Sequence, residues 1–192
     1  MTNRFIDISL ILLLSGMLLS PITAAHADDS KATKQTTEIE RILVEIDRES
    51  QRISKLGKRL ANAEDLTRAA LESRHIRARL NHLEQNQNFL KLVTQQEEAS
   101  DINKKYQQQA LSILESQLQA FEPTITALRG RIVLPEATAS ASEQAASFSQ
   151  IFEEVDRMDR VYQIQLDTIE LATLLGRDID AEKVALQKTL LE

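Results

Sequence analysis

The sequence predicts an all-α protein, built as a long antiparallel helical hairpin or coiled coil followed by further bundle helices. The 192 residues include only four glycines and three prolines, the residues that most often interrupt helices. Aromatic residues make up 4% of the chain and tryptophan is absent, which argues against a large globular core. Apolar residues recur at alternating steps of three and four, a spacing that places them on one face of an α-helix.

Charge and cysteine usage exclude several classes of protein. Asp and Glu number 29 against 23 Lys and Arg, for a net charge of −6. An acidic, evenly mixed surface offers no basic footprint for nucleic acid, so no nucleic-acid partner is expected. The chain has no cysteine, which rules out disulfides and thiolate metal sites.

Residues 1–27 are predicted to be a secretory signal peptide. Arg4 precedes the apolar run Ile8–Leu19, and small residues at Ala25 and Ala27 supply a cleavage site. The alternative is an uncleaved membrane anchor, but the apolar run is shorter than the ~20 residues that span a bilayer as a helix. We therefore expect the mature protein in the periplasm of a Gram-negative bacterium, with 28–36 as a disordered linker.

The stretch 37–97 is predicted to form a single very long helix, with one glycine and no proline. About sixty residues at 1.5 Å each would span roughly 90 Å, too long for a core helix of a compact domain. Its apolar stripe therefore needs a second helix alongside. In the first half, which only Glu49 interrupts, the stripe comprises Ile39, Ile42, Ile46, Ile53, Leu56, Leu60 and Ala63.

A second helix is predicted to begin near residue 101 and to fold back on the first. Ser100 is a suitable N-cap and Asp101 places an acid in the first turn. The alternative is one unbroken helix with a stutter in its pattern. Because Pro123 cannot donate a backbone hydrogen bond, we expect a kink or restart there. The predicted hairpin thus covers 37–134, and the returning stripe is Ile102, Tyr106, Ala110, Ile113, Leu114, Leu118 and Phe121.

Residues 135–142 are predicted to be a linker, and 143–192 a pair of helices. Ser140 and Glu143 have the spacing of a capping box. Gly176 is a suitable C-terminal cap, and Asp178 or Asp180 can start the last helix. Its apolar pattern still runs at the final residue, so we expect a chain that continues beyond this sequence. The stripe of the first of these helices is Phe148, Ile151, Phe152, Val155, Met158, Tyr162, Leu166, Ile169 and Leu174.

No catalytic, cofactor-binding or metal-binding residues are predicted, and we expect no enzyme and no cofactor. His75 and His82 are two helical turns, about 10 Å, apart, too far to share a metal ion. Glu72 and His75 have the Glu-x-x-His spacing of di-iron bundles, but such a site needs two of these motifs and two further glutamates. The favoured interpretation of Glu72 and His75 is a solvated helix face.

Two further groups are interpreted structurally. Four arginines are expected to form ion pairs with Glu64, Glu72 and Glu84; the alternative is contact with an acidic partner or lipid headgroups. The arginines are Arg68, Arg74, Arg77 and Arg79. The aromatic residues at helical spacing are expected in a core rather than around a cofactor: Phe148, Phe152 and Tyr162.

Nearly the whole mature chain resembles the N-terminal periplasmic region of the larger, multi-domain channels of the small-conductance mechanosensitive (MscS-like) family. The resemblance rests on the Glu/Arg/Leu-rich segment 38–80, the break and restart over 97–118, and the capped helix that opens 142–192. In that family such segments precede transmembrane helices, a pore helix and a cytoplasmic β-domain, none of which lies in this sequence. The resemblance implies a helical extension that couples membrane tension or osmotic state to gating, and no pore residue is carried over.

The alternative is a stand-alone periplasmic coiled-coil scaffold or accessory of an envelope transport or TonB/ExbB-type complex, supported by a weaker resemblance to small periplasmic coiled-coil proteins. Expected partners are helices of the same or neighbouring subunits and a membrane channel or envelope protein. A homo-oligomer remains an alternative to the hairpin, because an intermolecular coiled coil satisfies the same apolar stripe.

Overall fold

The computed structural model describes residues 29–95, 101–181, 183, 184 and 186, and within these residues the fold is all-α, with no strand. The predicted fold class is therefore confirmed, while the predicted signal peptide, 1–27, lies outside the described residues. No helix in the described part of the chain is long and apolar enough to cross a membrane. The four helices are α1 (Asp29–Ala61), α2 (Asp65–Thr94), α3 (Asp101–Arg129) and α4 (Ala141–Leu174).

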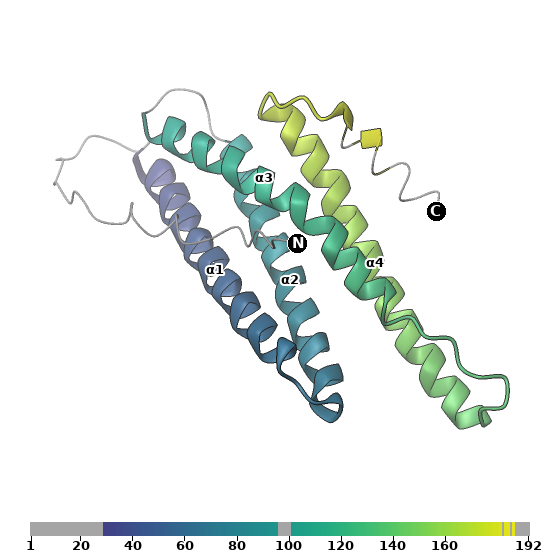
Figure 1. Cartoon of the computed structure of the whole chain (residues 1–192). Coiled ribbons are helices and arrows are strands. Elements are labelled where there is room, and N and C mark those ends of the chain that lie inside the picture. Colours follow the sequence, from purple (N-terminus) through teal and green to yellow (C-terminus); the bar gives the residue numbers. More distant parts are fainter. Residues whose placement is uncertain (1–28, 96–100, 182, 185, 187–192) are drawn as a thin grey trace, which may run out of the picture.

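Each helix runs antiparallel to the one before it (Figure 1). α2 packs against α1, α3 and α4 and so lies at the centre of the bundle. Phe89 of α2 and Ala110 of α3 belong to one buried cluster, and Ile76 of α2 and Leu128 of α3 belong to a second one. α3 therefore folds back on α2, as predicted, and the alternative of one unbroken helix with a stutter is wrong. Residues 96–100, between the two helices, lie outside the described residues.

The expectation of one helix over 37–97 is wrong, because the chain reverses at 62–64 and forms two helices instead. The last turn of α1 tightens: the amide of Asn62 donates to Arg59 O at 3.2 Å, and its side chain donates to Lys58 O at 3.0 Å. An Asn at a helix end satisfies carbonyls that have no partner within the helix. The apolar stripe of α1 packs against α2, which is the next helix along the chain.

The predicted linker at 28–36 is also corrected, because α1 already begins at Asp29. The segment is polar, but lysine, alanine and glutamine are good helix formers. Once the apolar turns that follow are fixed, each residue added in front contributes a hydrogen bond without a new nucleation step. The polarity of this segment therefore does not prevent it from forming the first turns of α1.

α3 continues through Pro123 to Arg129, so the expected restart at this proline does not occur. Pro123 leaves one helix carbonyl without its backbone donor, yet the residues that follow it keep the helix packed in the bundle. Thr124 is fully buried and its hydroxyl donates to Ala120 O at 2.8 Å, while Ile125 is buried in the core.

The connection from α3 to α4 spans 130–140, so it begins five residues before the predicted linker 135–142 and ends two residues before that linker does. It exposes Val133 and Leu134. The predicted capping box is confirmed: Ser140 accepts from the amide of Glu143, whose carboxylate accepts from the amide of Ser140. Gly176 is confirmed as the C-terminal cap, with a φ of 74°.

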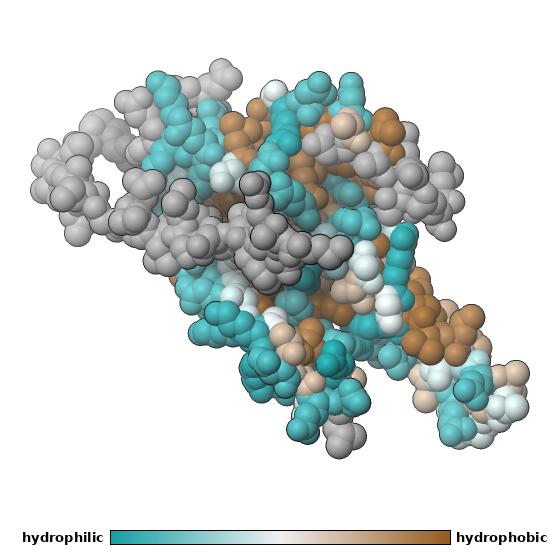
Figure 2. Space-filling view, viewed as in Figure 1, coloured by the Kyte–Doolittle hydropathy of each residue, from teal (hydrophilic) through white to brown (hydrophobic). Residues whose placement is uncertain are grey.

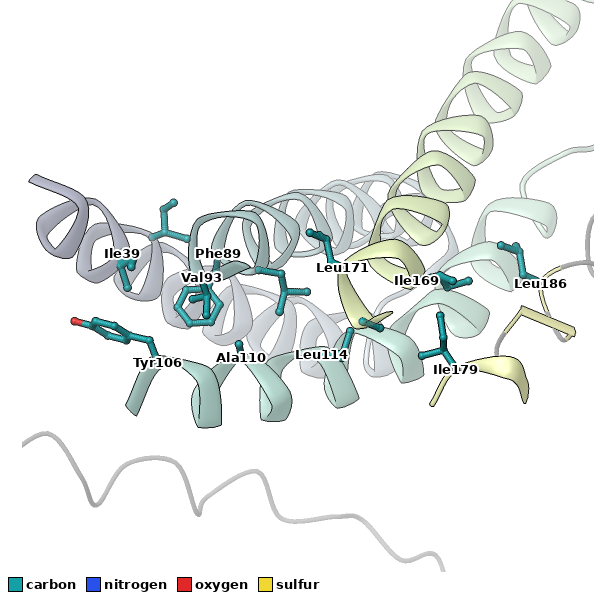
Figure 3. Close-up of a cluster of buried hydrophobic side chains, with 13 residues drawn as sticks. Ile39, Phe89, Val93, Tyr106, Ala110, Leu114, Ile169, Leu171, Ile179 and Leu186 are labelled. Atoms are coloured by element: carbon teal, nitrogen blue, oxygen red, sulfur yellow. The ribbon is translucent and has the colours of Figure 1, made fainter. Parts of the chain in front are cut away.

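Three apolar clusters form the interior. The largest joins all four helices at one end of the bundle, and Figure 3 shows its side chains converging from separate helices. A second cluster joins α2, α3 and α4. A third, smaller cluster lies between α1 and α2 and contains Leu56, Leu71 and Ala78. The fold is thus a four-helix bundle. The turn between α1 and α2 and the start of α4 lie apart from each other (Figure 1).

Candidate functional site

The two histidines of α2 face α1 rather than solvent. A Cβ atom added at Gly57 would lie 3.8 Å from His75 Nε2, so the glycine allows the ring to approach α1 closely. Burial lowers the pKa of both rings; the Arg79 charge lowers that of His75 further, and Glu49 opposes the shift at His82. The expected solvated face is therefore wrong for His75, and both half-buried rings lie at the interface between the two helices.

The four arginines of α2 do not form the expected ion-paired face with Glu64, Glu72 and Glu84. Arg68 lies 3.9 Å from Asp65, whereas Glu84 pairs with Arg160 of α4. Arg79 is partly buried, and burial lowers its pKa. Arg74 and Arg77 remain exposed, so this group divides between a helix interface and the surface.

Polar side chains also cross the bundle interior. Asn86 donates to Gln117 Oε1 at 2.9 Å, and Gln117 donates to Leu83 O at 2.9 Å. Both side chains are almost fully buried, as is Glu49. Buried polar groups that pair only in one alignment fix the register of packed helices, and this is the role we assign to them.

Among the described residues no group of three or more His, Asp and Glu side chains is arranged to hold a metal ion. The hollow at the α1–α2 turn is broad and open to solvent. It is lined by Lys58, Arg59, Asn62, Ala63, Glu64, Thr67 and Leu71. A wide, shallow surface of this kind does not exclude water from a substrate.

The first half of α4 has a different character, because its apolar side chains point away from the bundle. The first buried residue of the helix is Glu154. The exposed fractions are 46% for Phe148, 71% for Phe152 and 46% for Val155. The expectation that Phe148 and Phe152 belong to a core is therefore wrong, whereas Tyr162 is partly buried against two clusters.

These residues form a continuous line on the solvent side, which we call the outer stripe: Phe148, Phe152, Val155, Asp159 and Leu166. Together with the half-buried Tyr162 they follow steps of 4, 3, 4, 3 and 4, the heptad spacing of a helix that packs against another helix. Leu166 is 44% exposed. Figure 2 shows apolar surface gathered where α4 and the 130–140 connection meet.

The side of α4 that does pack is fixed by an ion cluster. Glu154 is 1% exposed and pairs with Arg131 Nε at 2.7 Å and with Arg157 Nη1 at 2.9 Å. Burial opposes its ionisation, but the hydrogen bonds from the two arginines outweigh burial and hold the pKa of Glu154 below its ordinary value. Because Glu154 faces inward, the outer stripe must face outward.

The sequence contained a signal for this face. α4 carries two sets of apolar residues, and the prediction followed the line through Phe152 and Leu166 and left out the other set. Val161, Ile164 and Leu171 are buried, while the heptad line through Phe152 and Leu166 lies on the opposite side of the helix. When a helix with two apolar sides packs into a bundle through one of them, the other side stays exposed to solvent.

The fold and this face define a helical bundle with an unpartnered heptad stripe. Comparison with known protein families, curated proteins and solved structures finds no significant match to this chain.

Proposed function

We propose that this protein is a non-catalytic helical docking module of the bacterial cell envelope. The observation that carries the proposal is the outer stripe, on which Phe148 and Phe152 hold large apolar surfaces in water at heptad spacing. Aromatic side chains of this kind are the residues that most often dominate binding energy at interfaces. Exposed apolar patches on an otherwise polar surface mark interaction sites.

We further propose that the module works as the periplasmic helical region of a mechanosensitive channel of the MscS-like type. The resemblance of the helical segments supports this placement, and so does a bundle that presents a helix-binding face. In this role the module would pack on the channel's membrane helices or on a neighbouring subunit, and so bias the tension at which the channel opens.

Deletion of the codons for residues 28–192 from the full gene tests this role. We expect a changed gating threshold in patch clamp and lower survival after osmotic downshock. The double substitution Phe148→Ser and Phe152→Ser should reproduce the effect without unfolding the bundle, because both side chains are exposed. Val44→Ser, at a 69% exposed apolar residue of α1, is the matched control. Unchanged gating and assembly after the deletion would contradict the channel role.

The second candidate is a stand-alone scaffold or accessory of an envelope transport or TonB/ExbB-type complex. The three internal clusters favour it, because they bury apolar surface entirely within this chain. The DNA sequence past codon 192 separates the two candidates. Codons for several hydrophobic spans and a β-rich tail support the channel, and a stop codon beside ExbB-like genes supports the accessory.

A further inference from the structure

We propose that the outer stripe of α4 binds a cationic amphipathic helix, with an apolar heptad face bordered by Lys or Arg. This inference rests on the proposed docking function and specifies the chemistry of the partner. It follows from the charges that accompany the stripe and from the failure of the other possible occupants to match them.

Acidic side chains lie within and beside the outer stripe. The basic group beside it is Arg129, whose guanidinium donates to the Tyr162 hydroxyl at 3.3 Å. Asp159 occupies one of its heptad positions. Asp156 follows the stripe position Val155 by one residue, and Glu170 follows Leu166 by four, so both lie on the side of the helix that carries the stripe. All three side chains are exposed, and none forms an ion pair with another described residue.

The arginines nearest in sequence are already engaged elsewhere. Arg157 pairs with Glu153 and Glu154 on the packed side of the helix. Arg160 reaches across to Glu84 of α2. Arg129 donates to the Tyr162 hydroxyl and is not ion-paired with these carboxylates. A bound helix with basic side chains can therefore pair with Asp159 and its acidic neighbours. Charge-assisted pairs across an interface add specificity and speed association.

A second copy of this chain is a poor occupant. If two outer stripes met in parallel, Asp159 would face Asp159. In an antiparallel pair centred on the stripe, Asp159 would face Val155 of the other copy. Either arrangement buries the Asp159 carboxylate against an acidic or an apolar side chain, which is unfavourable. An anionic lipid surface is excluded by the same acidic groups, since such surfaces attract basic segments.

The apolar part of the stripe sets the shape of the partner. Phe148, Phe152 and Val155 occupy three successive heptad positions, so they contact a helix that lies along α4 rather than across it. A basic side chain on that helix, opposite Asp159, would pair with the carboxylate at the middle of the interface. The same helix with an acidic side chain at this place would meet repulsion.

Two designed peptides test the proposal. Both are amphipathic helices with the same Leu/Ile heptad face; one has Lys at the flanking positions and opposite Asp159, and the other has Glu at those positions. Binding of each fluorescent peptide to the purified chain is measured by anisotropy at low and high salt. We expect the Lys peptide to bind at least about tenfold more tightly, and to lose affinity at high salt because screening weakens exposed charge pairs.

Variants of the chain locate the binding. Phe152→Ser should weaken the Lys peptide about tenfold or more, whereas Val44→Ser should leave it unchanged. The charge reversal Asp159→Lys should invert the preference in favour of the Glu peptide. Circular dichroism of each variant verifies that the helices persist.

The remaining outcomes overturn the inference in distinguishable ways. Equal binding of both peptides, still sensitive to Phe152→Ser, would refute the cationic partner and leave the docking function standing. Binding of neither peptide would refute both. Light scattering could instead show that the chain self-associates and that Phe152→Ser abolishes this association. The occupant of the outer stripe would then be a second copy of the chain, not a cationic helix. Binding to anionic vesicles that depends on Phe152 would replace it with a lipid surface.

Discussion

At the scale of single residues, Glu154 shows how a charge is accommodated inside this bundle. A buried carboxylate is unfavourable unless it is paired, and here two arginines from different segments supply the pairing. Arg131 belongs to the connection after α3, so the cluster joins that connection to α4. The other buried polar side chains, such as Asn86 and Gln117, are held by hydrogen bonds in the same way.

Replacement of Glu154 by Gln should lower the free energy of unfolding by about 1–3 kcal/mol, because a buried group loses its charge-assisted bonds. The folded-state pKa of Glu154 lies below its ordinary value of 4.5. The ionised carboxylate therefore stabilises the fold above that pH, and the advantage is lost as the pH falls through the folded-state pKa. The free energies of unfolding of the wild-type chain and of Glu154→Gln, measured with urea, should therefore converge as the pH is lowered.

Glu153→Gln is the matched control for that measurement. Glu153 also pairs with Arg157, at 3.3 Å, but its side chain is 65% exposed. An exposed pair of this kind contributes about 0.5 kcal/mol or less. A loss at Glu153 equal to that at Glu154 would show that burial does not decide the effect.

At the scale of helices, some helix ends follow from local chemistry more than from packing. The two ends of α4 illustrate this. At the start, Ser140 and Glu143 exchange hydrogen bonds. At the end, the amide of Gly176 donates to Thr173 O and that of Arg177 donates to Ala172 O, each at 3.0 Å. This pair of bonds is a Schellman motif, which requires a left-handed residue.

Gly176→Ala should lower stability by roughly 1–2 kcal/mol, because a Cβ atom disfavours the left-handed conformation. Nothing lies within 4 Å of such a Cβ atom, so the effect would come from the backbone alone. Gly130→Ala is the control: Gly130 has no positive φ, and the nearest atom to its added Cβ is Thr126 O at 3.5 Å. There we expect unchanged stability or a gain of about 0.4–1 kcal/mol.

The reversal between α1 and α2 can be tested by cross-linking, since the chain has no native cysteine. Cysteines at Gly57 and His75 should be joined within one molecule by a short bis-maleimide, because these positions are in contact. In one continuous helix they would be about 27 Å apart. The control pair Thr37 and His75 should not react, because Thr37 lies about 30 Å along α1 from Gly57.

At the scale of the whole molecule, apolar residues serve two purposes. One set is shared among the helices in three buried clusters. The other, the outer stripe, lies on the surface of α4 at the end where the helix extends past its neighbours (Figure 1). Stability and binding therefore depend on different residues, which makes them separable by mutation.

Two phenylalanines make the separation measurable. Phe89 is fully buried in the largest cluster, so Phe89→Ala should cost about 3–5 kcal/mol in unfolding free energy. Phe152 is 71% exposed, and Phe152→Ala should change stability by no more than about 0.5 kcal/mol. Thermal and urea unfolding measure both. A large loss of stability at Phe152 would show that it belongs to the core after all.

The sequence by itself determined the helical class, the capping box at Ser140 and the cap at Gly176, because propensity, spacing and capping act within a few residues. It also located Glu49 as an interruption of the stripe. Only the tertiary structure decided that the chain turns at 62–64 and that His82 lies near Glu49. It alone decided which apolar side of α4 the bundle covers. Periodicity states which side chains share a face of a helix, but the partner of that face depends on how distant segments pack.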